Sequence, residues 1–176
     1  MPRQIIGHAI VSVDGKIAVA DGAVPPALRN DADWARFQAH LDAADLVVVG
    51  RQGHERNPNP GRKRLVATGR VADLASDPND KHATLWNPSG ISFESAIAAL
   101  GHADGIVAVA GVFDLFRERF TAFDLAETQT TLIRDGLPCF SYGHPRMVLA
   151  ENGLSPVHWE VLDAAAGVTL THWERG

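Results

Sequence analysis

The sequence has little of the material that several common kinds of functional site require. Among its 176 residues there is one cysteine, Cys139, so an internal disulfide is excluded and a reducing cytoplasm is favoured. Its setting in LPCFSY is typical of a packed small hydrophobic residue rather than a nucleophile. The longest apolar runs, DLVVVG and GIVAVAGVF, fall far short of the roughly 20 residues that cross a bilayer. The N-terminal apolar stretch is also too short for a signal peptide.

Several catalytic motifs are missing as well. No G-x-G-x-x-G follows a predicted strand, so the standard Rossmann fingerprint is absent, and no G-x-x-x-x-G-K-[ST] indicates a P-loop kinase. The eight histidines form no H-E-x-x-H or other metal-ligand spacing, and no G-x-S-x-G elbow is present. Metal-dependent hydrolysis and acyl transfer therefore have no support, and we predict no metal.

Charge is unevenly distributed along the chain. The net charge of −5 gives no reason to expect nucleic acid or a membrane as a partner. Between Arg51 and Arg70, however, six basic residues accompany one acid, Glu55, whereas the rest of the chain holds 10 basic and 20 acidic residues. A basic segment in an acidic protein favours a phosphate-bearing ligand, and the alternative is a solvated loop with scattered arginines.

The hydrophobic pattern predicts alternating strands and helices. Strands are expected at 4–12, 45–50, 63–69, 83–87, 105–111 and 123–132, helices at 30–44, 92–101 and 112–120, a loop at 51–61 and a terminal hairpin within 157–174. This order predicts an α/β three-layer sandwich in one domain over residues 1–176. Its central sheet would be mainly parallel, with an antiparallel C-terminal hairpin.

Four of the predicted strands have glycine at their carboxyl ends. In mainly parallel sheets, ligands bind at the carboxyl ends of the strands. All four of the ends considered carry glycine and two carry arginine: Asp14-Gly15, Gly50-Arg51, Thr68-Gly69-Arg70 and Ala110-Gly111. The sequence therefore predicts a ligand site at this edge of the sheet.

Five segments, in order, resemble the dihydrofolate reductase-like superfamily. HAIVSVDGKIA is similar to the opening strand of the riboflavin-biosynthesis pyrimidine reductase family, with its Ser-x-Asp-Gly-[Lys/Arg] turn. DLVVVGRQGHE resembles the shared Val-Gly-Arg-x-Thr-x-Glu segment, and NPGRKRLVATGR resembles a stretch of dihydrofolate reductase. GIVAVAGVFDLFRERF is similar to the strand, Gly-Gly turn and helix that hold the cofactor pyrophosphate, and HWEVLDAAAGVTLTHWERG resembles the terminal hairpin.

The resemblance implies a dihydrofolate reductase-like fold and NADPH-dependent reduction of a small heterocyclic substrate, as by 5-amino-6-(5-phosphoribosylamino)uracil reductase. Gly50 would let the backbone approach the cofactor, and Arg51 and Arg70 would face its phosphates. The helix after Gly111 would present free amides to the pyrophosphate. The expected cofactor-binding residues are Gly50, Arg51, Gln52, Gly53, Arg64, Thr68, Gly69, Arg70, Ala110, Gly111, Val112 and Phe113.

The expected catalytic residues are Asp14 and Asp33, and the expected substrate-binding residues are His8, Ser12 and Asp31. Asp33 lies four residues before Phe37 and Asp31 three before Trp34, and both are spacings of the acid that holds the pterin in dihydrofolate reductases. The alternatives stay open: Asp14 as a plain turn residue, Asp31 as a helix cap and Asp33 as a solvated acid.

Two other functions are weighed against this one. NPGRKR and the helix-start acid favour a dihydrofolate reductase-like pterin reductase. Gly53 and Ala110 stand where the family has threonine and glycine, and they favour a non-catalytic nucleotide-binding relative. His8 stands where the riboflavin type has lysine. The resemblance also implies a homodimer, for which the apolar surface of the terminal hairpin is the expected interface.

Overall fold

The computed structural model describes residues 2–57 and 59–176 and divides the chain into two compact units. Unit 1 comprises residues 2–5 and His40–Val112, and unit 2 comprises Ile6–Ala39 and Phe113–Gly176. The boundaries fall inside strand β1 (Gln4–Val11) and helix α1 (Asp31–Ala43), and the expectation of a single domain stays a prediction. None of the helices described is long and apolar enough to cross a membrane.

Unit 1 is built on a mainly parallel set of strands in the order β7-β3-β4-β6-β5. The β7/β3, β3/β4 and β4/β6 pairs are parallel, and β5 runs antiparallel to β6. The strands are β3 (Leu46–Gly50), β4 (Arg64–Ala67), β5 (Leu74–Asp77), β6 (Asp80–Trp86) and β7 (Ile106–Val109), and the helices are α2 (Arg51–Arg56) and α3 (Phe93–Ala99). The aliphatic residues of β3 are buried, as expected for a strand that is covered on both faces.

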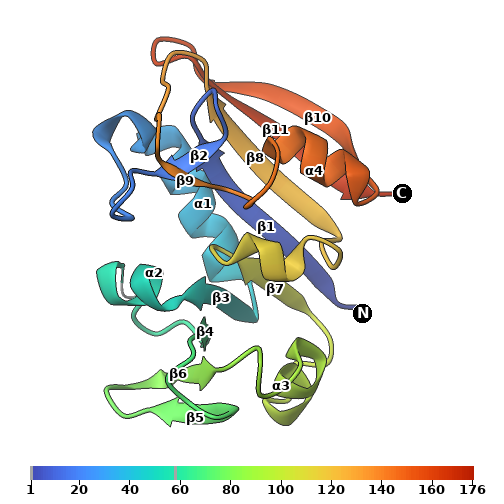
Figure 1. Cartoon of the computed structure of the whole chain (residues 1–176). Helices are drawn as coiled ribbons and strands as arrows, with labels where there is room; N and C mark the ends of the chain where they lie inside the picture. The colour runs from blue at the N-terminus through green and yellow to red at the C-terminus, as the bar shows by residue number, and fades with distance from the viewer. Residues whose placement is uncertain (1, 58) are drawn as a thin grey trace. The chain divides into compact units, whose positions relative to one another are not determined.

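Unit 2 has the strand order β10-β11-β8-β1, in which β1 and β8 are parallel and the other pairs antiparallel. The hairpin of β10 (Leu154–Asp163) and β11 (Val168–Arg175) lies at the edge of these strands (Figure 1). The remaining elements are β2 (Lys16–Ala18), β8 (Ala122–Thr128), β9 (Leu137–Pro138), α4 (Pro145–Glu151) and the 3₁₀ helices η1 (Pro26–Leu28) and η2 (Phe113–Phe116). Strands β2 and β9 pair as a small separate sheet.

The two faces of the unit 2 strands are covered by different helices. Side chains alternate along a strand, so Asp124 and Glu127 of β8 point to opposite faces. Asp124 contacts Arg36 of α1, whereas Glu127 contacts Arg146 of α4. Phe123, on the Glu127 face, packs in an aromatic core with four further phenylalanines: Phe113, Phe116, Phe120 and Phe140.

The predicted α/β class is confirmed, with mainly parallel strands and an antiparallel C-terminal hairpin. Two local predictions are wrong. Residues 51–61, expected as a loop, begin with the short helix α2. The helix expected at 112–120 is only the 3₁₀ turn η2, because Val112 has a left-handed backbone (φ 49°) that a helix cannot continue through. Strand β5 and helix α4 were not predicted.

Candidate functional site

The predicted glycine turns of unit 1 meet at the carboxyl ends of β3 and β7. A Cβ atom on Gly111 would lie 3.5 Å from the backbone nitrogen of Gly50, and one on Gly50 would lie 3.2 Å from Cγ1 of Val112. The Ala110 amide donates to the Val48 carbonyl (2.9 Å), which continues the pairing of these two strands. The absence of side chains therefore lets the two turns approach each other closely.

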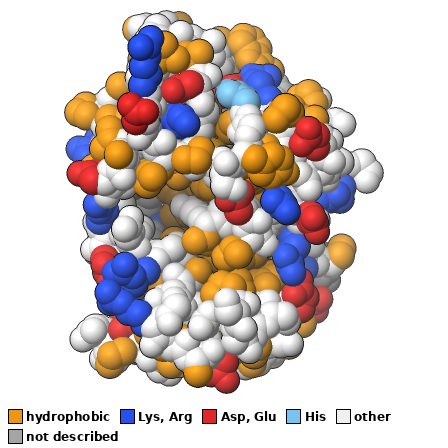
Figure 2. Space-filling view, in the orientation of Figure 1, with side chains coloured by type: hydrophobic (Ala, Val, Ile, Leu, Met, Phe, Trp, Pro, Cys, Tyr) orange, Lys and Arg blue, Asp and Glu red, His pale blue; other side chains and the backbone are white. Residues whose placement is uncertain are grey.

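Two arginines converge beside these turns on a single carboxylate. Nη1 of Arg51 lies 3.2 Å and Nη1 of Arg70 3.8 Å from Oε1 of Glu55. The Arg70 amide donates to the Thr68 hydroxyl (3.2 Å), which fixes the turn that carries this arginine. Figure 2 shows basic side chains gathered on the left of the view, over α2. Two cations that share one exposed acid leave a net positive charge that an anionic ligand can satisfy.

The backbone next to the arginines is accessible. No atom lies within 4 Å of the Cβ position of Gly53 or of Gly69, and neither has the positive φ that would require glycine. Gln52, between Arg51 and Gly53, is exposed. These positions leave room for a bulky ligand against the main chain, which fits a nucleotide cofactor held by its phosphates.

Phe113 was also predicted to bind the cofactor, but its side chain is part of the aromatic core of unit 2. Its side chain is buried in unit 2, with its ring centroid 5.6 Å from that of Phe123 and 6.2 Å from that of Phe140. Because η2 begins at Phe113 and Val112 is left-handed, no regular helix presents free amides directly after Gly111. The expected helix N-terminus for the pyrophosphate is therefore absent here.

Arg64 also lies elsewhere. It is the first residue of β4, at the opposite end of that strand from Thr68, and it is 1% exposed. Its guanidinium forms an ion pair with Asp80. The hydrogen bond from the His82 amide, together with Arg64, lowers the pKa of the Asp80 carboxyl. The structure gives Arg64 a role in the packing of β4 and β6 and does not bring it to the glycine turns.

In unit 2, Ser12 and Asp14 hold together the turn that follows β1. The Ser12 hydroxyl donates to Oδ1 of Asp14 (2.6 Å), which also accepts from the Ile133 amide (3.0 Å). Burial raises the pKa of Asp14, but these hydrogen bonds outweigh it, so the pKa is lowered. Gly15 has φ 76°, and a Cβ atom there would lie 2.8 Å from Cδ of Pro145. The carboxylate of Asp14 thus ties the turn to the segment around Ile133.

At the start of α1, the two predicted acids differ in their surroundings. Asn30 caps the helix, because its Oδ1 accepts from the Asp33 amide (3.1 Å), and Asp31 is exposed in the first turn. Asp33 is buried, with Oδ1 3.7 Å from Nη2 of Arg36. Burial raises the pKa of the Asp33 carboxyl, and Arg36 offsets only part of that rise. Asp33 therefore keeps its proton to higher pH than a solvated aspartate does.

An ionic row crosses the face of the unit 2 strands that α1 covers. His8 of β1, Asp124 of β8 and His172 of β11 are aligned in register. Nδ1 of His8 lies 3.4 Å from Oδ2 of Asp124, and Nδ1 of His172 lies 2.6 Å from Oδ1. Arg36 reaches the same carboxylate at 3.1 Å and so connects the row to Asp33.

The surroundings of Asp124 favour its charged form. Burial raises its pKa, but the hydrogen bond with His172 and the charges of Arg36 and the histidines lower it further than burial raises it. Two predicted residues, His8 and Asp33, are thus brought together by side chains that the sequence analysis did not single out. A signal was present, because β8 carries Asp124 and Glu127 in a mostly apolar strand, and buried acids are usually paired.

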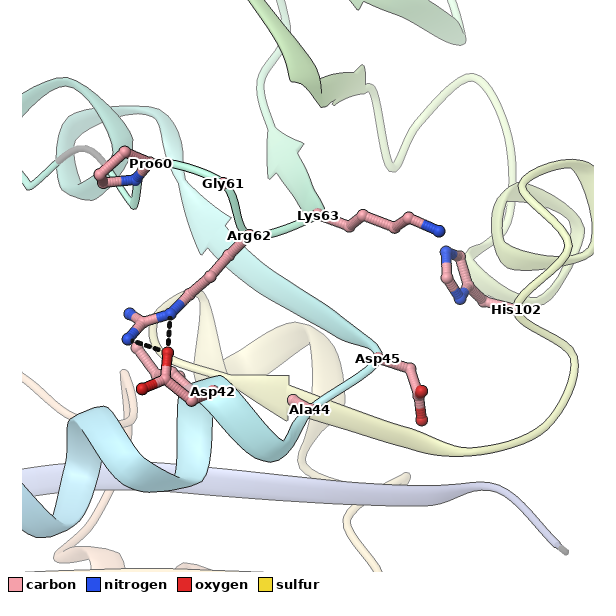
Figure 3. Close-up of a pocket in the computed structure, with 9 residues that line it drawn as sticks. Asp42, Ala44, Asp45, Pro60, Gly61, Arg62, Lys63 and His102 are labelled. Carbon is pink, nitrogen blue, oxygen red and sulfur yellow. Dashed lines mark hydrogen bonds and ion pairs between the residues drawn. The ribbon is translucent and has the colours of Figure 1, made fainter.

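A cavity of about 500 Å³ lies at the other end of the unit 1 strands. Lys63 and His102 face each other across it, and Arg62 forms an ion pair with Asp42 (2.6 Å) at one side (Figure 3). Burial and the charge of Lys63 lower the pKa of His102. Its walls include none of the predicted site residues, so the predicted site and this cavity are separate.

No protein-family model matches the sequence, and neither does any curated protein. Among solved structures, a protein assigned to riboflavin biosynthesis in Shewanella sp. PV-4 is similar over 98% of this chain and 99% of its own, with a TM-score of 0.69 and 17% identity. Dihydrofolate reductase from Enterococcus faecalis, complexed with NADP(H) and RAB-propyl, is similar over 98% of this chain and 96% of its own, with a TM-score of 0.65 and 16% identity.

A third similar structure is longer than this chain. It is a diaminohydroxyphosphoribosylaminopyrimidine deaminase/5-amino-6-(5-phosphoribosylamino)uracil reductase from Thermotoga maritima, with a TM-score of 0.68 and 18% identity. The match covers 99% of this chain but only 57% of the Thermotoga chain. Together these similarities establish that the fold is dihydrofolate reductase-like.

Proposed function

We propose that the protein is an NADPH-dependent reductase of a small heterocyclic substrate, of the 5-amino-6-(5-phosphoribosylamino)uracil reductase type. The observation that carries the proposal is the group of glycine turns at the ends of β3, β4 and β7, with Arg51 and Arg70 beside them. The fold supports it, since similar structures include one described as that reductase and a dihydrofolate reductase complexed with NADP(H). The turn Ser12–Lys16 favours the riboflavin type.

On the cofactor side, Arg51 and Arg70 would exchange Glu55 for phosphate. A guanidinium binds phosphate through two parallel hydrogen bonds, and Arg70 is 68% exposed, so little rearrangement is needed. Gly53 and Gly69 would let the ligand lie against the main chain. When bound, NADPH supplies the hydride, and the protein supplies position and a proton.

On the substrate side, Asp33 would be the acid that handles the proton. Its raised pKa suits a group that must carry a proton, whereas the carboxylate of Asp14 already accepts two hydrogen bonds within its turn. Arg36 would hold Asp33 in position. We assign Asp14 and Ser12 to the shape of the turn rather than to proton transfer.

Calorimetric titration with NADPH tests the cofactor side. We expect saturable binding that weakens about tenfold in Arg70→Ala, because one charge-assisted phosphate contact is lost. Arg56→Ala is the matched control, since it removes an exposed arginine of the same basic segment. Equal weakening in both variants would show that only total charge matters and would refute the assignment of Arg70.

The second candidate is a pterin reductase, favoured by the buried acid Asp33 at the start of α1. Once NADPH binding is established, turnover of a ribosylaminopyrimidine against turnover of dihydrofolate decides between the two. Asp33→Asn is expected to abolish turnover of the true substrate while leaving NADPH affinity unchanged.

The third candidate is a nucleotide-binding relative without catalysis. Gly53 and Ala110 depart from the family pattern, and the expected helix N-terminus after Gly111 is replaced by a left-handed Val112. Failure to bind NADPH at millimolar concentration would reject both reductase proposals. Binding without turnover of either substrate would support this third function.

A further inference from the structure

The guanidinium of Arg36 is shared unequally between two buried carboxyls. Its Nη1 lies 3.1 Å from Oδ2 of Asp124, whereas its Nη2 lies 3.7 Å from Oδ1 of Asp33. The first distance is that of a close ion pair, and the second exceeds the length of a hydrogen bond. The positive charge of Arg36 is therefore held mainly by Asp124, although Asp33 is the nearer residue along the chain.

The fold leaves Arg36 little freedom to change this division. Arg36 follows Asp33 by three residues on α1, a spacing that puts both side chains on one face of the helix. Asp124 meets that face from β8. The side chain of Arg36 is 18% exposed and that of Asp124 is 4% exposed, so water does not readily replace either partner. The unequal sharing is thus a property of how α1 packs on the unit 2 strands.

Two histidines restrain the carboxylate that holds the guanidinium. His8 and His172 contact Asp124 from β1 and β11, the strands on either side of β8. The His172 ring is itself anchored, because its Nε2 lies 3.1 Å from Oε1 of Glu174. Asp124 is therefore held between its two neighbouring strands, and its approach to α1 is fixed by the register of the sheet.

The charges that act on Asp33 come from α1 and β8. Burial raises the pKa of its carboxyl most strongly, Arg36 lowers that pKa, and the negative charge of Asp124 raises it again. Asp163 of β10 is bound instead by the side chain of Asn30 (2.9 Å), and the histidines of the ionic row face Asp124. The protonation of Asp33 therefore depends on how two acids divide one positive charge.

We propose that Asp124 is a positioning residue for the proposed reaction, because it holds the guanidinium of Arg36 and so leaves Asp33 free to carry a proton. Arg36 then orients Asp33 without keeping its carboxyl ionised. The side chain of Asp33 is 12% exposed and that of Asp124 only 4%, so Asp124 acts through Arg36 and does not touch the substrate. The inference rests on the proposed function, in which Asp33 handles the proton.

Carbon-13 NMR of protein labelled at its aspartate carboxyls tests the coupling without cofactor or substrate. The Asp33 signal is the one that disappears in Asp33→Asn, and its titration midpoint in the wild-type protein should lie above the ordinary aspartate value of about 3.9. In Asp124→Asn this midpoint should fall by about half a pH unit or more, because Arg36 then pairs with Asp33 alone. An unchanged midpoint in the folded variant, or an ordinary midpoint in the wild-type protein, would overturn the proposal.

Glu127→Gln is the matched control, because it removes the same charge from the same strand. Glu127 is a buried acid that contacts Arg146 on the opposite face of β8, so the Asp33 midpoint should not move. Arg36→Met should move that midpoint upward, since Asp33 then loses its cation and still faces Asp124. Equal shifts in Glu127→Gln and Asp124→Asn, or no rise in Arg36→Met, would refute the shared-arginine coupling.

Turnover of the ribosylaminopyrimidine with NADPH gives a readout that a merely structural role of Asp124 would not move. If protonated Asp33 is the active form, kcat should fall as the pH rises past its midpoint, and this fall should begin at lower pH in Asp124→Asn but not in Glu127→Gln. Turnover whose pH profile is unchanged in Asp124→Asn would refute the positioning role. A shifted NMR midpoint without turnover would support the coupling of Asp124 to Asp33 and reject the reductase proposal.

Discussion

The arginines around α2 and the ionic row of unit 2 use similar side chains under opposite conditions of exposure. Glu55, which Arg51 and Arg70 share, is 51% exposed, whereas the side chain of Asp124 is 4% exposed. An exposed ion pair adds only about 0.2–1 kcal/mol to stability, while removal of one partner from a buried pair costs about 3–5 kcal/mol. The first group can exchange its partner for a ligand, and the second is fixed by the fold.

The largest expected effect comes from removing the centre of the buried row. Asp124→Ala leaves Arg36 and two histidines without their shared carboxylate and should lower the free energy of unfolding by about 3 kcal/mol. Urea denaturation followed by tryptophan fluorescence measures this change. The exposed Asp31→Ala is the control, with an expected change below about 0.5 kcal/mol. Equal urea midpoints for the two variants would show that the buried carboxylate of Asp124 is no more important for stability than an exposed one.

A smaller effect is expected on the opposite face of β8. Glu127 accepts from Nε of Arg146 at 2.9 Å, but the Arg146 side chain is 44% exposed and can turn to water when its partner is lost. Glu127→Ala should therefore lower the free energy of unfolding by about 1–2 kcal/mol, less than Asp124→Ala. The same urea experiment ranks the two. A larger loss for Glu127→Ala would show that exposure of the cation does not govern the cost.

Asp124 of the ionic row and Asp33, which Arg36 connects to the row, should respond to pH in opposite directions. The folded state lowers the pKa of Asp124, so its stabilisation is present above the ordinary aspartate pKa of about 3.9 and is lost as the pH falls below it. The folded state raises the pKa of Asp33, so ionisation of Asp33 destabilises the fold as the pH rises above about 3.9.

This difference has a direct test in stability measured against pH. Asp33→Asn should be more stable than the wild-type protein at neutral pH, by up to about 1 kcal/mol, and the advantage should disappear as the pH approaches 3. Asp124→Asn should show the reverse, a deficit at neutral pH that narrows in acid. If the stability of both variants, relative to the wild-type protein, changed with pH in the same direction, the folded state would not shift the pKa values of these two carboxyls in opposite directions.

The smallest effect on stability is expected in the exposed group. Arg70→Ala should leave the free energy of unfolding within about 0.5 kcal/mol of the wild-type value, because the pair with Glu55 is long and solvated. The same variant should lose about tenfold in NADPH affinity, as proposed above. If Arg70→Ala lost stability but kept its NADPH affinity, Arg70 would serve the fold and not the ligand, which would contradict the proposal.

The sequence predicted those parts of the fold where one pattern dominates. Strand β3 is a continuous aliphatic run, and α3 is capped by Ser92, whose side chain accepts from the Ser95 amide. Helix α2 was missed because its residues form no apolar face and include a glycine. Helix α4 was also missed, although Pro145 at its first turn after His144 is a known start signal.

The sequence predicted the glycine turns of the candidate site. It did not predict the contacts between side chains that come from strands far apart in the sequence. Gly50 and Gly111 could be placed together because both follow parallel strands. The link from Asp33 through Arg36 to Asp124 depends on which residues of β1, β8 and β11 share a register, and periodicity does not specify that register. Arg64 was wrongly predicted to bind the cofactor. It is close in sequence to the glycine turn after β4, but it lies at the opposite end of that strand.

The open surroundings of Gly53 and Gly69 have a consequence for how this protein can change over generations. Side chains at these positions would meet no atom within 4 Å and need no unusual backbone angle. Natural variation or directed evolution can therefore place new chemistry beside the arginines with little effect on folding. By contrast, a Cβ atom on Gly7 would lie 2.2 Å from the ring of Phe123, so that position is closed to the same exploration.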